Sequence, residues 1–133
     1  MEKFPEAAQV NESIRILLVE DNESLTEMMQ EIFNHEGYDF KCVPAVENIF
    51  SLLDEYKPKL VMLDYLLPNV NGGELCCQIK NHPDYSAIPV IIYSALSKAL
   101  ISIGDYGCDA FIEKPFDLNE LLKMIKKLLH KEN

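Results

Sequence analysis

Short apolar runs alternate along this chain with longer segments of helical periodicity. Three runs, Ile14–Val19, Leu60–Leu63 and Ile88–Ile92, consist mainly of aliphatic residues, and each has the length of a buried strand. Two further short runs, Asp39–Val43 and Ala110–Ile112, complete the set. The pattern therefore predicts five strands.

Between these runs, apolar residues recur at three- and four-residue spacing, which predicts amphipathic helices. The apolar positions are Leu25, Met28, Met29, Ile32 and Phe33 in the first helix, Val46, Ile49, Phe50, Leu52 and Leu53 in the second, Leu75, Cys76 and Ile79 in the third, and Leu118, Leu121, Leu122, Ile125, Leu128 and Leu129 in the last. Gly37 supplies a stop for the first helix, and Asp117 with Glu120 forms a capping box for the last. Between Ser97 and Gly107 only a short fourth helix fits.

Five strands alternating with five helices predict an α/β fold with a doubly wound parallel sheet. Right-handed crossovers favour the flavodoxin-like strand order 2-1-3-4-5. The length of 133 residues suits one domain, which we expect over residues 14–131, after an N-terminal extension over residues 1–13. In such sheets the ligand site lies outside the carboxyl ends of the strands.

Polar residues follow four of the predicted strands at that edge. Glu20 and Asp21 follow the first strand, Asp64 the third, Ser94 the fourth and Lys114 comes shortly after the fifth. Clustered carboxylates raise one another's pKa unless a cation is shared among them. Because all the ligands are hard oxygens, the expected cation is Mg²⁺.

A phosphoryl-transfer site accounts for all of these residue types. Asp64 can act as a nucleophile on phosphorus and form an aspartyl phosphate, while the other acids hold the metal. Lys114 can supply a positive charge and Ser94 a hydroxyl donor to the phosphoryl oxygens. Each residue type alone is a weak signal, since most such residues at strand ends are structural or solvated. Their joint placement carries the prediction.

Four motifs extend this prediction to a known family. They are Leu-Val-Glu20-Asp21-Asn, Asp64-Tyr-Leu-Leu-Pro68 followed by Gly72, Tyr93-Ser94-Ala95, and Lys114-Pro115-Phe116. From about Ile14 to Leu129 the chain resembles the receiver domains of two-component response regulators. The resemblance implies a phosphoacceptor domain of a phosphorelay.

The resemblance also implies a role for each residue in the metal pocket. Asp64 is the implied phosphoacceptor, Asp21 a direct Mg²⁺ ligand, and Glu20 an acidic partner that acts largely through water. The backbone carbonyl of Leu66 completes the implied protein ligands, together with Asp64 itself. Mn²⁺ is an expected substitute for Mg²⁺.

The implied switch couples Ser94 to an aromatic residue three positions before Lys114. That residue is Phe111, which lacks the hydroxyl of the commoner Tyr, and an alternative interpretation makes Phe111 a plain core residue of an edge strand. By the same resemblance, Ser94 and Lys114 contact the phosphoryl group, and the Lys114–Pro115 peptide bond is cis, an isomer that X-Pro bonds adopt more readily than others.

Two departures from the family pattern affect regulation. The stretch from Ser94 to Lys114 is a couple of residues shorter than usual, which predicts a trimmed fourth helix on a face that many members use for partners or dimers. Leu66 and Leu96 occupy variable positions beside the phosphoryl group, where apolar side chains should exclude attacking water. We therefore expect a long-lived phospho-form.

Charge and hydropathy exclude several other classes of function. Twelve basic and 22 acidic residues give a net charge of −10, which disfavours a nucleic-acid partner. The basic residues Lys123, Lys126, Lys127 and Lys131 suit the C-terminal end of a helix. No segment approaches the roughly 20 apolar residues that span a bilayer, so a membrane role is not expected and a cytoplasmic location is. Cys42, Cys76, Cys77 and Cys108 have no C-x-x-C spacing and are expected to be small, partly buried apolar residues.

The favoured function is a signalling domain that receives its phosphoryl group from a sensor histidine kinase or a histidine phosphotransfer protein. We expect no enzymatic activity beyond self-phosphorylation from a phosphodonor and slow autodephosphorylation. Because the sequence stops soon after the last helix, output is expected through an unknown downstream protein, and a homodimer is possible.

Two alternatives come from other classes. A Mg²⁺-dependent phosphohydrolase with an aspartyl nucleophile needs a second acid two residues later to protonate the leaving group, and Leu66 stands there. A flavodoxin-like nucleotide or flavin carrier needs a Gly-rich phosphate loop after the first strand. The acidic pair Glu20 and Asp21 occupies that place instead.

Overall fold

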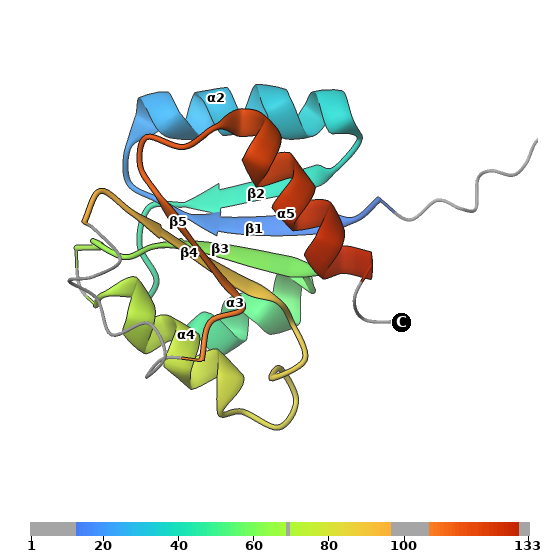
Figure 1. The fold of residues 1–133 in the computed structure, drawn as a ribbon. Helices are drawn as coiled ribbons and strands as arrows, with labels where there is room; N and C mark the ends of the chain where they lie inside the picture. Colours follow the sequence, from blue (N-terminus) through green and yellow to red (C-terminus); the bar gives the residue numbers. More distant parts are fainter. Residues whose placement is uncertain (1–12, 69, 97–106, 131–133) are drawn as a thin grey trace, which may run out of the picture.

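The computed structural model describes residues 13–68, 70–96 and 107–130, and shows a five-stranded sheet covered by helices on both faces (Figure 1). In chain order the elements are β1 (Arg15–Val19), α2 (Glu23–Glu36), β2 (Asp39–Val43), α3 (Ile49–Tyr56), β3 (Leu60–Asp64), α4 (Gly72–Lys80), β4 (Val90–Ser94), β5 (Ala110–Glu113) and α5 (Leu118–His130). The short helix predicted between Ser97 and Gly107 falls almost entirely outside the described residues. Among those residues no helix is long and apolar enough to cross a membrane.

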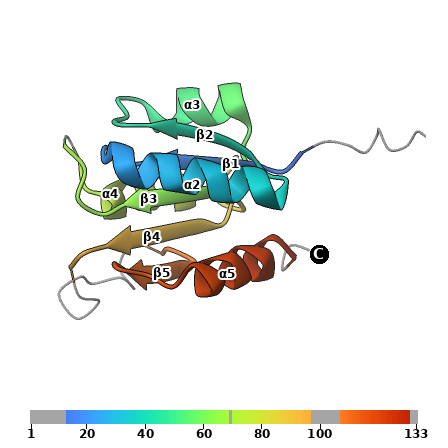
Figure 2. The same cartoon turned by 90° about the horizontal axis from the view of Figure 1, so that it is seen from above.

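The strand order is β2-β1-β3-β4-β5 with every pair parallel, which confirms the predicted topology. Strands that run the same way end at the same edge, and in Figure 2 the arrowheads of β2, β4 and β5 point to one side of the molecule. Asp64 at the end of β3 pairs in register with Tyr93 of β4, and Ser94 pairs with Glu113 of β5. This register brings the candidate site residues to one edge.

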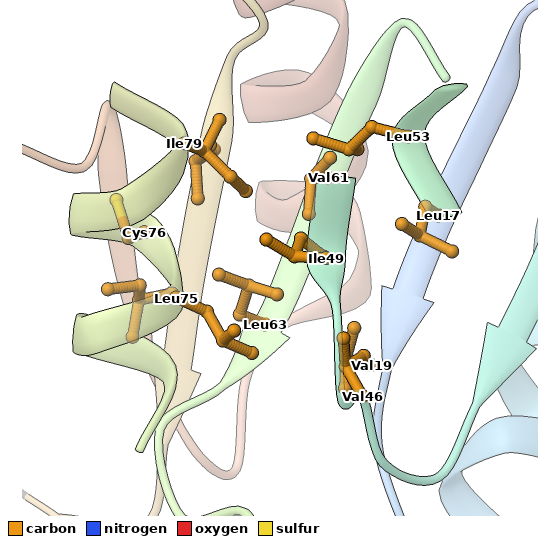
Figure 3. Packing of buried hydrophobic residues seen from close by; sticks show 12 residues of the cluster. Leu17, Val19, Val46, Ile49, Leu53, Val61, Leu63, Leu75, Cys76 and Ile79 are labelled. Carbon is orange, nitrogen blue, oxygen red and sulfur yellow. The ribbon is translucent and has the colours of Figure 1, made fainter. Parts of the chain in front are cut away.

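Side chains of the strands alternate between two buried clusters, one on each face of the sheet. On β4, Val90 and Ile92 pack under α3 and α4, whereas Ile91 and Tyr93 pack under α2 and α5. Figure 3 shows the first of these clusters, where α3 and α4 cover the central strands. A strand whose side chains are buried on both faces of the sheet is apolar along its whole length. This is why continuous apolar runs in the sequence predicted these strands.

The helix boundaries follow from capping residues. Asn22 begins α2 by accepting a hydrogen bond from the Leu25 N–H. Gly37 ends this helix with a φ of 87°, as the sequence predicted. Asn48 caps α3 in the same way. Val46 was predicted as part of that helix, but because Asn48 starts the helix two residues later, Val46 packs from the preceding loop instead.

The start of β4 is also later than predicted. The apolar run begins at Ile88, but the strand begins at Val90, because Pro89 has no N–H for the ladder and contributes only its carbonyl, to the Val61 N–H at 3.0 Å.

The cysteines match the expectation: Cys76 is buried, and the remaining three are half-buried.

Candidate functional site

Three carboxylates meet at the carboxyl edge of the sheet. Glu20 and Asp21 follow β1, Asp64 ends β3, and one ligand oxygen from each lies within 4.8 Å of the others. Glu20 and Asp64 are only 2% and 5% exposed, whereas Asp21 is exposed. The pocket therefore has two buried anions at its floor and a third anion facing solvent.

Lys114 is the cation of this pocket. Its Nζ lies 3.3 Å from Glu20 Oε1 and 3.3 Å from Asp64 Oδ2. The Lys114 backbone N–H donates to the Ser94 carbonyl at 2.7 Å, which fixes the residue directly after β5. The following Lys114–Pro115 bond is cis, as the resemblance implied. Among the residues that the structure describes, one ammonium group thus faces two buried carboxylates, which leaves an excess of negative charge.

Glu20 is held as an anion by donors on both of its oxygens. The Tyr93 hydroxyl donates to Oε1 at 2.6 Å, and the Asn22 N–H donates to Oε2 at 3.0 Å. Burial alone would raise the pKa of Glu20, but these hydrogen bonds and the charge of Lys114 outweigh it, and the pKa lies below its ordinary value. Burial and donation to Glu20 raise the pKa of Tyr93, which keeps its hydroxyl a donor.

The pKa of Asp64 is shifted in the opposite direction from that of Glu20. Burial and the negative charge of Glu20 raise the pKa of Asp64, against the lowering effect of the Leu66 N–H and of Lys114. The Leu66 N–H donates to Oδ1 at 3.0 Å. Two neighbouring carboxylates with pKa values pushed apart are typical of sites where the two groups have different chemical roles.

Ser94 lies at the end of β4, next to β3, and is fully buried. Its Oγ accepts a hydrogen bond from the Leu96 N–H at 3.0 Å. Leu66, whose backbone N–H donates to Asp64, is 51% exposed, so its side chain faces solvent. The structure thus brings Glu20, Asp21, Asp64 and Lys114 into one cluster, with Ser94 on the adjoining strand.

Phe111 lies apart from this cluster. It is half-buried on β5 and packs against the apolar cluster under α3 and α4. It also lines a hollow of about 380 Å³ together with Phe116 and Met124. This position fits a core residue of an edge strand, and the switch role of Phe111 stays a prediction.

Tyr93 is the site residue that sequence reasoning missed, because it entered only as part of a motif. The available signal was a hydroxyl-bearing side chain directly after the apolar run Val90–Ile92, since a buried Tyr hydroxyl needs a partner. Gly72 also gains a role. Its N–H donates to the Tyr65 carbonyl at 2.8 Å, and a Cβ there would overlap the Asp64 carbonyl oxygen. Gly72 therefore lets α4 start against the end of β3.

Comparison with known proteins gives consistent matches. The family described as response regulator receiver domain matches residues 16–126. Response regulator ArlR of Staphylococcus saprophyticus is 36% identical over 124 residues, which cover 89% of this chain and 53% of that protein. ArlR of Staphylococcus aureus is 33% identical with the same coverage. The chain thus spans about half the length of these relatives.

Solved structures agree on the fold. The signal receiver domain of a signal transduction histidine kinase from Syntrophus aciditrophicus superposes with a TM-score of 0.82 and 31% identity, covering 90% of this chain and 92% of that one. The receiver domain of sensor histidine kinase PA1611 from Pseudomonas aeruginosa, crystallised with a magnesium ion in its own active-site cleft, has a TM-score of 0.78 and covers 90% of this chain and 99% of that one. At 21% identity it supports the fold alone.

A doubly wound sheet with an acidic pocket and one lysine at its carboxyl edge defines a class of phosphorylation-controlled signalling domains. The chain belongs to the response regulator receiver domain family of two-component systems.

Proposed function

We propose that Asp64 is the phosphoacceptor of this receiver domain, in a Mg²⁺-dependent reaction, and that the phospho-form signals by binding another protein. The observation that carries the proposal is the pocket itself, in which oxygens of Glu20, Asp21 and Asp64 converge within 4.8 Å beside the ammonium of Lys114. Membership of the receiver family supports the same assignment. The residue roles named here are those that the resemblance implied.

The donor set fits Mg²⁺. All three side chains offer hard carboxylate oxygens, which Mg²⁺ prefers along with water and phosphate oxygens. Asp21, Asp64 and the Leu66 carbonyl would be the direct ligands, with Glu20 acting largely through water, and Mn²⁺ would fit the same set. When bound, the ion supplies positive charge that neutralises the phosphoryl oxygens.

The chain's own residues divide the remaining work. A carboxylate oxygen of Asp64 forms the new bond to phosphorus while the bond from phosphorus to the donor breaks, so the donor leaves with the electron pair. Lys114 moves its ammonium from the two carboxylates to the phosphoryl oxygens, and the Ser94 hydroxyl donates to one of them. Burial of Asp64 excludes bulk water from the product.

Membership of the receiver family supports the proposed classes of upstream and downstream partner. The donor is a sensor histidine kinase or a histidine phosphotransfer protein, and the output is an unidentified protein or a second copy of this chain. Catalysis beyond self-phosphorylation and slow autodephosphorylation is not part of the proposal. No observation favours the alternative phosphohydrolase. The domain limits 14–131 and the cytoplasmic location stay predictions.

A small phosphodonor tests the proposal. Incubation with Mg²⁺ and acetyl phosphate should add one phosphoryl group by intact mass, and Asp64→Asn should abolish the adduct. Asp84→Asn, at an exposed loop position, is the matched control and should accept the group normally. Absence of any adduct on the wild-type chain would overturn the proposal, and steady turnover of general phosphatase substrates would favour the phosphohydrolase.

A further inference from the structure

We propose that Tyr93 is a positioning residue of the Mg²⁺ pocket, whose hydroxyl holds the Glu20 carboxylate toward Asp21 and Asp64. The inference rests on the proposed Mg²⁺ site and adds a residue that none of the four motifs marks as functional. It begins from the 2.6 Å hydrogen bond between the Tyr93 hydroxyl and Glu20 Oε1, which is buried and joins residues 73 positions apart.

The path of the Tyr93 side chain explains why this contact is specific. Tyr93 belongs to β4 and Glu20 follows β1, while β3 lies between these two strands in the sheet. The ring therefore reaches across the central strand, on the face covered by α2 and α5. Its backbone is fixed by pairing in register with Asp64, and from that position the hydroxyl reaches Glu20 Oε1.

Two further contacts hold the ring itself. Phe116 packs edge-on against it, with ring centroids 6.1 Å apart at 90°, and the Lys114 ammonium lies 4.8 Å from its centroid. A ring that is held by two such contacts presents its hydroxyl in one direction without further ordering cost. The position and orientation of the Tyr93 hydroxyl are thus set before a metal ion binds.

The role becomes clear when Lys114 leaves. In the structure Glu20 Oε1 is shared by the Tyr93 hydroxyl and the Lys114 ammonium. Once Lys114 turns to a phosphoryl group, Tyr93 is the donor that remains on Oε1, while the Asn22 N–H stays on Oε2. Glu20 therefore keeps its direction, and each of its oxygens keeps an open lone pair that can accept from a metal-bound water. Groups that orient a metal-binding side chain in this way commonly change metal affinity by about 10- to 100-fold when removed.

The test is the variant Tyr93→Phe, which keeps the ring and removes only the hydroxyl. Mg²⁺ affinity measured by calorimetry should fall about tenfold, equivalent to about 1.4 kcal/mol, and so should Mn²⁺ affinity measured by electron paramagnetic resonance. The Mg²⁺ concentration for half-maximal phosphorylation should rise by the same factor. Tyr85→Phe is the matched control, because it also removes a hydroxyl that donates to a carboxylate, that of Asp54, and it should leave Mg²⁺ affinity unchanged.

A second background separates positioning from general packing. In Glu20→Met the carboxylate is gone, so adding Tyr93→Phe should change Mg²⁺ affinity no further. Equal Mg²⁺ affinity in wild type and Tyr93→Phe would overturn the inference, whereas a wild-type chain that binds no Mg²⁺ would overturn the proposed function itself. In the wild-type protein, Mg²⁺ should shift the NMR signals of the Tyr93 ring and leave those of Tyr85 in place. If the Tyr93 signals do not move, the inference fails even without a variant.

Discussion

Single residues in this pocket show how similar groups acquire opposite properties. Glu20 and Asp64 are both buried beside Lys114, yet the pKa of Glu20 is lowered and that of Asp64 is raised. The difference arises because Glu20 accepts hydrogen bonds from Tyr93 and Asn22 as well, while Asp64 has the Leu66 N–H and feels the charge of Glu20. In the metal-free protein, one carboxylate is therefore stabilised as an anion and the other is destabilised.

This contrast predicts opposite effects of two isosteric variants in metal-free protein at pH 7. Asp64→Asn should raise stability by about 1 kcal/mol, or about 4 °C in melting temperature. The reason is that it removes one of the two buried negative charges that share the Lys114 ammonium group. Glu20→Gln should lower stability by about 1–3 kcal/mol, because the Tyr93 hydroxyl, the Asn22 N–H and the Lys114 ammonium lose a charged acceptor. Thermal unfolding in the presence of a chelator measures both.

The pH dependence of the two effects follows from the directions of the pKa shifts. The raised pKa of Asp64 means that its protonated form stabilises the folded state. This stabilisation is fully present below the ordinary pKa of 3.8 and is lost as pH rises through the raised pKa. A lowered pKa means that ionised Glu20 stabilises the fold above its ordinary value of 4.5, and this stability is lost as pH falls through the lowered value. Both variants should therefore approach wild-type stability in acid. An Asp64→Asn effect that is equal at pH 7 and pH 3 would contradict the assignment.

The apolar residues Leu66 and Leu96, whose backbone N–H groups donate to Asp64 and Ser94, predict a slow loss of the phosphoryl group. Leu66 and Leu96 offer no hydrogen bond to orient an attacking water, so the phospho-form should persist well beyond seconds. Leu66→Asn should shorten its lifetime by supplying such a group, whereas Leu66→Met should not. Decay after removal of acetyl phosphate, followed by intact mass, gives the lifetimes, and a wild-type lifetime of only seconds would refute the prediction.

The sequence predicted the site residues that stand at the ends of strands. It did not predict Tyr93, which holds one of them in place. Glu20, Asp64 and Lys114 could be placed together because parallel strands end at one edge. Tyr93 could not, since its partner is 73 positions away and the contact depends on strand register and side-chain direction.

At the scale of elements, helix ends depend on single polar residues more than on apolar periodicity. Asn22, Asn48 and Asn71 each precede a helix and accept hydrogen bonds from its first turn. Periodicity in the sequence therefore predicted that the helices exist but placed Val46 inside one. A buried residue just before a cap follows the same apolar pattern as a helical residue.

The start of α4 offers a test at this scale. Gly72→Ala places a Cβ within 3.0 Å of the Asp64 carbonyl carbon, so α4 and the end of β3 must separate. We expect a loss of about 1–3 kcal/mol in unfolding free energy and weaker Mg²⁺ binding, because Asp64 moves. Gln78→Ala, on an exposed turn of the same helix, is the control in urea unfolding and should have little effect. Wild-type Mg²⁺ affinity in Gly72→Ala would show that the helix start does not position Asp64.

Across the whole molecule, the strand order was predictable because strands alternate with helices and crossovers have one hand. The contacts that hold distant segments together were not. Lys80, at the end of α4, places its Nζ 3.0 Å from the Ser86 carbonyl, 2.8 Å from the Ile88 carbonyl and 2.8 Å from Asp109 Oδ2. Asp109 also accepts the Val90 N–H at 2.8 Å. One ammonium thus joins α4, the approach to β4 and the approach to β5.

Removal of this charge should loosen that side of the domain. Lys80→Met keeps the aliphatic part of the side chain and leaves Asp109 without its cation, and we expect a loss of about 2 kcal/mol. Lys123→Met, on the exposed surface of α5, is the control and should remain close to wild type. Hydrogen exchange should show faster opening of β4 and β5 in Lys80→Met. Unchanged exchange there would mean that the apolar cluster alone holds these strands.

The reach of Tyr93 across the central strand has an evolutionary consequence. The identity of position 93 is tied to Glu20 through the hydroxyl and to Phe116 through the ring, so substitutions at these three positions should be epistatic. A library that varies each position separately would score most changes as harmful and miss compatible combinations. Homologous sequences can be searched for the same rule: a polar residue at position 93 should be inherited together with its partners, as a unit.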